Sequence, residues 1–191
     1  MMEQLSKLKN RMFVGHWLDS NKLFGHGVEI GVMGGYNAKN ILRNWSGHLH
    51  LVDPWVHWDP KEYVDGANSV NMEEAYSECI RTMSEFPNRH TVCRLKSDDA
   101  FEHYKKLNVS FDFIYIDGCH HDPQVTRDVY QWWELLKTPG LYGGHDYMDI
   151  NTPEYICEVK KTVDRFAKEK GVEVHITSED PNDNSWWITK L

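Results

Sequence analysis

The sequence predicts a single α/β domain over residues 1–191, with a doubly wound, mostly parallel seven-stranded sheet and an antiparallel C-terminal edge strand. Three observations predict this fold. Apolar runs alternate with segments of helical periodicity, an order typical of parallel sheets covered by helices on both faces. The run 111–117 is almost continuously apolar, as expected of a central strand. The last two predicted strands, 172–176 and 185–189, follow one another without a helix, which predicts a hairpin.

The other elements follow from hydrophobic spacing and from helix start and stop signals. We expect strands at 27–32, 48–52, 91–95 and 141–144. We expect helices at 3–13, 35–44, 72–86, 97–107, 123–138 and 152–170. Residues 1–25 are the N-terminal helix and the lead-in to the first strand. The stretch 54–71 lacks a clear period, is rich in aromatic residues and is long for a plain connection, so we interpret it as a lid or substrate loop.

Charge and cysteine content limit the class of protein. The chain carries 29 acidic and 21 basic residues, a net charge of −8, and this balance argues against a nucleic-acid partner. Its four cysteines show no paired spacing, which favours reduced thiols and a cytoplasmic location. No apolar run approaches the length of a membrane span. The oligomeric state is left open, and a homo-oligomer is one possibility.

The stretch 27–35 reads Gly-Val-Glu-Ile-Gly-Val-Met-Gly-Gly and joins a predicted strand directly to a helix. Glycines in such a turn let a ligand sit against backbone N–H groups at the positive end of the helix dipole. The spacing departs from G-x-G-x-x-G, which argues against a nicotinamide oxidoreductase. The turn therefore predicts a nucleotide-like cofactor of another kind.

Polar residues follow three of the predicted strands. Asp53 ends the second, Asp117 ends the fourth, and His145 and Asp146 follow the fifth. In doubly wound sheets ligands bind beyond the carboxyl ends of the strands, where the strand order reverses. We therefore expect these side chains to converge on one edge of the sheet.

These motifs together resemble the class I S-adenosylmethionine-dependent methyltransferases, and in particular the small macrocin-type sugar O-methyltransferases. The resemblance rests on four segments in the expected order: Glu29-Ile30-Gly31, Val52-Asp53-Pro54-Trp55, Tyr115-Ile116-Asp117-Gly118-Cys119-His120 and Gly143-Gly144-His145-Asp146-Tyr147. It covers nearly the whole chain and implies the class I methyltransferase fold.

The resemblance also implies how the cofactor S-adenosylmethionine would be held. Glu29 would lie near its ammonium group and Gly31 near its methionine part, while Asp53 would accept hydrogen bonds from the ribose hydroxyls. Ser97 and Asp98 would reach the adenine edge. The cofactor-binding residues implied are Glu29, Gly31, Gly34, Asp53, Ser97, Asp98 and Asp117.

The metal-dependent members of this family hold a divalent cation after the fourth and fifth strands, which here implies Asp117, His145 and Asp146. The sequence departs from the family at His145, where a second carboxylate is usual. Because Mg²⁺ prefers oxygen ligands, an imidazole favours Mn²⁺ or a similar ion, or no metal at all. His120 matches the histidine of the Asp-Gly-x-His motif and is the candidate catalytic base, with Asp117 beside it.

We expect metal-assisted O-methylation of a sugar hydroxyl on a small molecule or glycan. The alternatives are a metal-independent methyltransferase for a phenolic or nitrogen acceptor, and a non-catalytic binding module. Several residues also have a structural interpretation. Asp53 could start a turn, Ser97 could cap a helix, and His145-Asp146 could be a buried pair. Asp128 could brace His120 or face water, and Trp55, Trp58 and Tyr63 could form a sugar platform or cover the cofactor.

Overall fold

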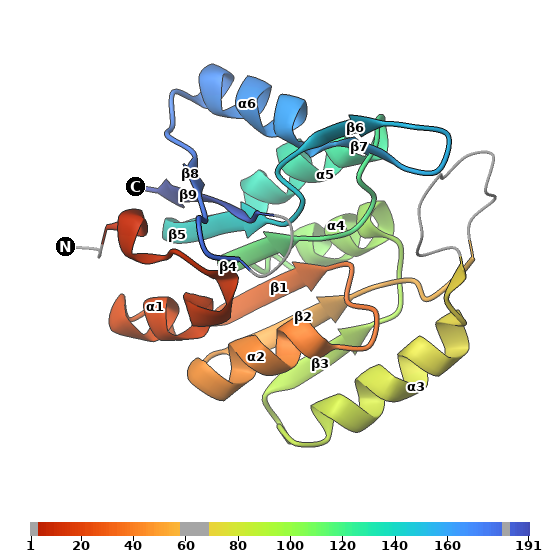
Figure 1. The fold of residues 1–191 in the computed structure, drawn as a ribbon. Helices are drawn as coiled ribbons and strands as arrows, with labels where there is room; N and C mark the ends of the chain where they lie inside the picture. The colour runs from red at the N-terminus through yellow and green to blue at the C-terminus, as the bar shows by residue number, and fades with distance from the viewer. Residues whose placement is uncertain (1–3, 58–68, 181–183) are drawn as a thin grey trace.

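The computed structural model describes residues 4–57, 69–180 and 184–191, and its main sheet has the predicted seven strands. The strands run in the order β3-β2-β1-β4-β5-β9-β8 (Figure 1). Their bounds are β1 His26–Ile30, β2 His48–Val52, β3 His90–Cys93, β4 Phe111–Ile116, β5 Leu136–Gly144, β8 His175–Ile176 and β9 Trp186–Lys190. The first five are parallel, and β9 pairs antiparallel with both β5 and β8. The predicted C-terminal hairpin is confirmed, although β8 is shorter than expected.

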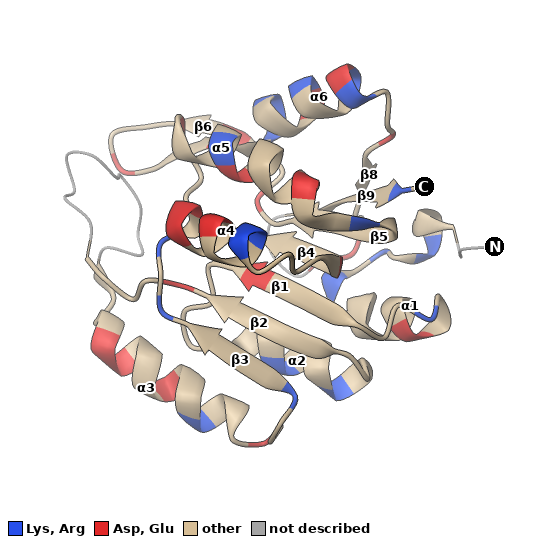
Figure 2. Ribbon diagram, turned by 180° about the vertical axis from the view of Figure 1, so that it is seen from behind, with Lys and Arg blue, Asp and Glu red and all other residues tan. Residues whose placement is uncertain are grey.

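Helices cover both faces of the sheet (Figures 1 and 2). The helices on one face are α1 Val14–Ser20, α2 Tyr36–Asn44 and α3 Met72–Met83, and those on the other are α4 Ser97–Lys106, α5 Gln124–Gln131 and α6 Val159–Lys170. Each face therefore has its own apolar core. Within the described ranges, no helix is both long and apolar enough to cross a membrane.

The strand order reverses between β1 and β4, and this position creates the site. The chain runs outward from β1 to β2 and β3, then returns to β4 on the other side of β1. The parallel register pairs Ile30 with Ile116 at the carboxyl ends of β1 and β4. The backbone N–H of Asp117 donates to the carbonyl of Ile30 over 2.7 Å, so the two strand ends lie side by side.

The prediction of a helix at 3–13 is wrong. The structure has two short 3₁₀ turns, η1 Leu5–Lys7 and η2 Arg11–Phe13, followed by α1. Residues between the turns bond instead to a distant segment: the carbonyl of Lys9 accepts hydrogen bonds from the backbone N–H groups of Ser178 and Glu179. These tertiary bonds outweigh the helical spacing of the apolar residues.

Three other boundaries also lie several residues away from their predicted positions. Helix α5 ends at Gln131, and a 3₁₀ turn, η4 Trp132–Leu135, leads into β5 well before Pro139. The early start is stabilised by Lys190, whose Nζ donates to the carbonyl of Leu136 over 2.7 Å. The predicted helix start at 152 is replaced by a small hairpin, β6 Asp149–Asn151 and β7 Ile156–Glu158, after which α6 begins. Gly171, with φ +67°, ends α6 as predicted.

Candidate active site

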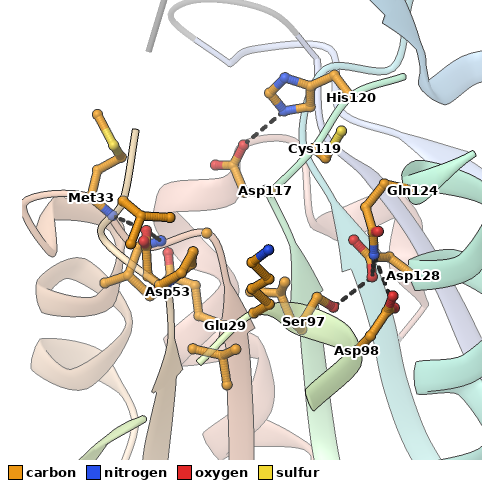
Figure 3. A pocket seen from close by; sticks show the side chains of 18 of the residues that line it. Glu29, Met33, Asp53, Ser97, Asp98, Asp117, Cys119, His120, Gln124 and Asp128 are labelled. Atoms are coloured by element: carbon orange, nitrogen blue, oxygen red, sulfur yellow. Dashed lines mark hydrogen bonds and ion pairs between the residues drawn. The ribbon is translucent and has the colours of Figure 1, made fainter. Parts of the chain in front are cut away.

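A cavity of about 840 Å³ opens at the carboxyl ends of the central strands (Figure 3). Its walls come from the loops after four strands: 31–34 after β1, 53–54 after β2, 96–99 before and at the start of α4, and 117–123 after β4. This volume lies within the range of about 300–1,000 Å³ usual for small-molecule sites. The site lies where the strand order reverses, as the sequence predicts.

The glycine turn after β1 is tightly constrained. Gly31 has φ +83°, and a Cβ added to it would lie 2.7 Å from the Cα of Gly118 and closer still to the Asp117 carbonyl. Met33 also adopts a left-handed conformation, with φ +49°. Only a residue without a side chain leaves room at Gly31, and its backbone consequently borders the cavity.

Asp53 braces this turn. Its Oδ2 accepts hydrogen bonds from the backbone N–H groups of Val32 and Met33 over 2.9 and 3.0 Å. Its Oδ1 accepts one from the N–H of Trp55 over 2.7 Å. The turn-forming interpretation of Asp53 is thus realised, and the carboxylate also lines the cavity. Because each carboxylate oxygen can accept about two hydrogen bonds, Oδ1 keeps acceptor capacity.

Glu29 points from β1 into the same cavity and is only 1% exposed. Its Oε1 accepts a hydrogen bond from Asn37 Nδ2 over 3.0 Å, whereas its Oε2 has no hydrogen-bond partner among the described residues. Burial raises the pKa of this carboxyl from 4.5 to about 8. A buried carboxyl oxygen without a partner fits a cationic ligand, whose charge would favour the ionised form of Glu29.

Two carboxylates and one imidazole form a compact cluster after β4 and β5. His120 Nε2 lies 3.5 Å from Asp117 Oδ1 and 3.1 Å from Asp146 Oδ2, and one ligand atom from each residue lies within 4.8 Å of the others. Two ligand atoms that each lie about 2.1 Å from one ion, with an angle of about 90–110° at the ion, are roughly 3.0–3.4 Å apart from each other. The donor set of Asp117, His120 and Asp146 therefore fits a divalent cation.

His145 lies beside the two carboxylates that the resemblance implies, but it is not in the compact ligand group. Its Nδ1 lies 3.0 Å from Asp146 Oδ1 and 3.9 Å from Asp117 Oδ1, on the edge of the cluster, and the compact ligand group contains His120 instead. Burial alone would lower the pKa of His145, but the hydrogen bond to Asp146 and the charge of Asp117 outweigh it, so the pKa is raised. His145 is thus in contact with Asp146, which also contacts His120.

A third group of polar side chains lies across the cavity from Met33 and Asp53 (Figure 3). Ser97 Oγ donates to Asp128 Oδ1 over 2.5 Å and accepts from Trp132 Nε1 over 2.8 Å. Ser97 therefore does not cap α4, whose N-cap residue is Lys96. Asp98 Oδ1 accepts from Gln124 Nε2 over 3.0 Å. This group is held by hydrogen bonds between α4 and α5.

Of the predicted cofactor residues, Glu29, Gly31, Gly34, Asp53, Ser97, Asp98 and Asp117 all line the cavity. Arg11 and Asp128 also line the cavity, and sequence reasoning gave neither of them a cofactor role. Arg11 is carried by the N-terminal segment, where its backbone N–H donates to Asp180 Oδ1 over 2.6 Å. No local motif marks Arg11, because its place depends on that long-range contact. Asp128 bonds to Ser97 and so does not brace His120.

Trp55 is neither a platform nor a cover. It is 1% exposed, its indole Nε1 donates to the Met33 carbonyl over 2.9 Å, and its ring packs against Tyr76. Trp55 thus belongs to the core beneath the glycine turn. Trp58 and Tyr63, and with them most of the predicted 54–71 loop, lie outside the described residues.

Comparison with known proteins agrees with this architecture. The O-methyltransferase from Bacillus cereus, solved in complex with SAH, is 15% identical and superposes with a TM-score of 0.65 over 94% of this chain and 80% of that one. The O-methyltransferase TomG from Streptomyces achromogenes, involved in tomaymycin synthesis and solved in complex with SAM, is 12% identical, with a TM-score of 0.63 over 95% and 80% of the two chains. No curated protein matches the sequence. The methyltransferase domain family matches residues 28–147, which is more than half of the chain. The chain belongs to this methyltransferase domain family.

Proposed function

We propose that this protein is an S-adenosylmethionine-dependent O-methyltransferase that uses a divalent cation and acts on a sugar hydroxyl. The observation that carries the proposal is that Asp117 and His120 line the same cavity as the Gly31 turn. A cofactor seated on the turn would therefore lie next to the cluster of Asp117, His120 and Asp146. The structural neighbours solved with SAM or SAH support the choice of cofactor.

The chain's own residues fit the parts of this cofactor. Gly31 lets the methionine part approach the backbone, and the unbonded Oε2 of Glu29 suits its ammonium group. Arg11 is a cation on the same lining and suits its carboxylate. Asp53 has acceptor capacity left for a ribose hydroxyl. When bound, S-adenosylmethionine supplies a methyl group activated by a sulfonium centre.

The cluster can promote methyl transfer in two ways. They are mutually exclusive because each requires the lone pair of His120 Nε2. If Asp117, His120 and Asp146 hold a cation, His120 Nε2 is a ligand and has no lone pair for a proton. An oxygen of Asp117 would then take the proton of the acceptor hydroxyl. A bound divalent cation would stabilise the developing negative charge on that oxygen. Without a cation, His120 Nε2 would be the base, and the carboxylates of Asp117 and Asp146 beside it would stabilise the imidazolium that forms, which suits a more acidic phenol.

The assignment of a sugar acceptor rests on the resemblance of the four strand-end motifs to macrocin-type enzymes. A small acceptor also agrees with a cavity of about 840 Å³, which exceeds what the cofactor alone would fill. A methylation assay with radiolabelled S-adenosylmethionine against panels of glycosides and phenols tests this assignment. Methylation confined to the phenols would refute the sugar acceptor.

Calorimetric titration with S-adenosylhomocysteine tests the cofactor, with Asp53→Ala as the variant. We expect wild-type binding and at least about tenfold weaker binding by the variant, since Asp53 braces the turn and lines the cavity. Equal binding by both proteins would refute the role of Asp53, and no binding by the wild type would refute the function.

Titration with Mn²⁺ tests the cation and the choice of histidine. We expect His120→Asn to abolish Mn²⁺ binding and His145→Asn, the matched control, to retain most of it. If His145→Asn abolishes Mn²⁺ binding and His120→Asn retains it, the ligands are Asp117, His145 and Asp146. Methyl transfer that survives exhaustive chelation would refute the cation and leave His120 as the base.

A further inference from the structure

Asp128 presents a carboxylate oxygen that the protein itself does not use. The side chain is 1% exposed and lines the cavity from α5. Its Oδ1 accepts hydrogen bonds from Ser97 Oγ, Gln124 Nε2 and Gln131 Nε2, over 2.5, 2.9 and 3.3 Å. Its Oδ2 has no hydrogen-bond partner among the described residues. A buried carboxylate oxygen without a donor is costly, and a ligand N–H would remove that cost.

The polar side chains of Ser97 and Asp98, next to Asp128, have hydrogen-bond or ion-pair partners within the protein. Ser97 Oγ donates to Asp128 and accepts from the indole of Trp132. Asp98 Oδ1 accepts from Gln124, and its Oδ2 lies 3.3 Å from the guanidinium of Arg127 at the surface. Of these carboxylate oxygens, Asp128 Oδ2 is the one that is buried and has no donor from the described residues. An added Cβ on Gly118 would lie 4.0 Å from it, so the loop after β4 borders the same oxygen.

The position along the cavity indicates which part of a ligand would meet Asp128. With the methionine part at Gly31 and the ribose near Asp53, as proposed above, the base extends toward the loops that precede α4 and α5. Figure 3 shows Asp128 with Ser97 and Gln124 on the side opposite Asp53. The exocyclic amine is the only hydrogen-bond donor on an N9-substituted adenine, whose ring nitrogens are acceptors. An acceptor oxygen at this end therefore matches the amine.

We propose that Asp128 Oδ2 accepts a hydrogen bond from the exocyclic amine of the bound adenine, and that Asp128 thereby sets the nucleobase specificity of the cofactor site. The inference rests on the proposed function and goes beyond it, because it moves base recognition from Ser97 and Asp98 to a residue on α5. Ser97 and Gln124, which make the two shorter bonds to Oδ1, then act as positioning residues that keep Oδ1 turned away from the base.

The experiment compares S-adenosylhomocysteine with S-inosylhomocysteine, in which a carbonyl replaces the amine. Burial raises the pKa of Asp128 to about 7, so titrations at pH 8 keep it ionised. We expect the wild type to bind the adenosyl ligand about 10- to 100-fold more tightly. In Asp128→Asn, Oδ1 still accepts from the protein, while the new Nδ2 donates toward the ligand. This variant should lose about tenfold or more with the adenosyl ligand and gain with the inosyl ligand, which reverses or abolishes the preference.

Gln131→Leu is the matched control, because Gln131 belongs to the same network but is not part of the cavity lining. It should change the affinities for both ligands by the same factor. An unchanged preference in Asp128→Asn would overturn the inference while leaving the cofactor intact. If the wild type binds neither ligand, the proposed function fails together with the inference.

A measurement on the wild type alone covers the case in which Asp128→Asn does not fold. The analogue of S-adenosylhomocysteine whose purine lacks the amine should bind about tenfold or more weakly than S-adenosylhomocysteine. Equal affinity for the two would overturn the inference.

Discussion

Replacing Gly31 with alanine should destabilise the protein and abolish cofactor binding, for two separable reasons. The first is conformational, since φ is +83° and an L-residue in the left-handed region costs about 1–2 kcal/mol. The second is steric. The new Cβ would lie 2.7 Å from the Gly118 Cα, whereas carbon atoms pack at about 3.5–4.0 Å, so the ends of β1 and β4 would have to separate by roughly 1 Å.

That separation strains the bond from the Asp117 N–H to the Ile30 carbonyl, which is 2.7 Å long. Overpacking of this kind costs about 1–3 kcal/mol. Together the two effects predict a loss of about 2–5 kcal/mol in the free energy of unfolding. Gly171→Ala is the matched control, because Gly171 has φ +67° and a Cβ there would have no neighbour within 4 Å. It should lose only about 1–2 kcal/mol.

Urea denaturation followed by tryptophan fluorescence measures both losses. Titration with S-adenosylhomocysteine should then show binding by Gly171→Ala and none by Gly31→Ala. Equal losses of stability in the two variants would refute the steric reasoning. Wild-type affinity in Gly31→Ala would refute the seating of the cofactor on this turn.

Three further predictions follow from the cavity and the core beside it. Because the pKa of Glu29 is raised from 4.5 to about 8 in the folded protein, its contribution to stability is fully present below pH 4.5 and is lost as the pH rises toward 8. The stability of Glu29→Gln relative to the wild type should therefore increase between pH 5 and pH 8.5 in urea titrations, and a constant difference would contradict the assigned burial. Arg11→Met should weaken S-adenosylhomocysteine binding about tenfold or more but leave 5′-methylthioadenosine binding unchanged, since only the former has a carboxylate; equal effects on both would argue against this pairing. Trp55→Phe loses a buried indole bond to Met33 and leaves a small void, so thermal denaturation should show a loss of about 1–3 kcal/mol, and an unchanged melting temperature would contradict its core position.

The fold was largely predictable because its signals are local. The strand 48–52 matches β2 residue for residue, since alternating apolar residues are stopped by Asp53 and Pro54. The central strand β4 was predicted from a continuous apolar run, and α2 and α3 begin within a residue of their predicted starts. Elements that depend on distant partners were missed. The N-terminal segment follows its bonds to Ser178 and Glu179 rather than its own helical spacing.

The site was predictable at the level of strand ends but not of side-chain directions. Parallel strands that reverse order beside β1 bring the residues after them to one edge, so Asp53, Asp117 and Asp146 could be placed together from the sequence alone. Whether Asp53 faces a ligand or the turn depends on the path of the turn itself, which folds two N–H groups onto its carboxylate.

The sequence by itself determined that acidic residues and histidines would meet at the switch point of a doubly wound sheet. The tertiary structure decided that His120, as well as His145, lies beside both carboxylates. His145 and Asp146 are neighbours in sequence, but Asp146 turns to φ +51° after β5, and its carboxylate meets His120 from the loop after β4. A side chain's direction at such a point is set by strand register and loop path together, and both are fixed by contacts between residues far apart in the chain.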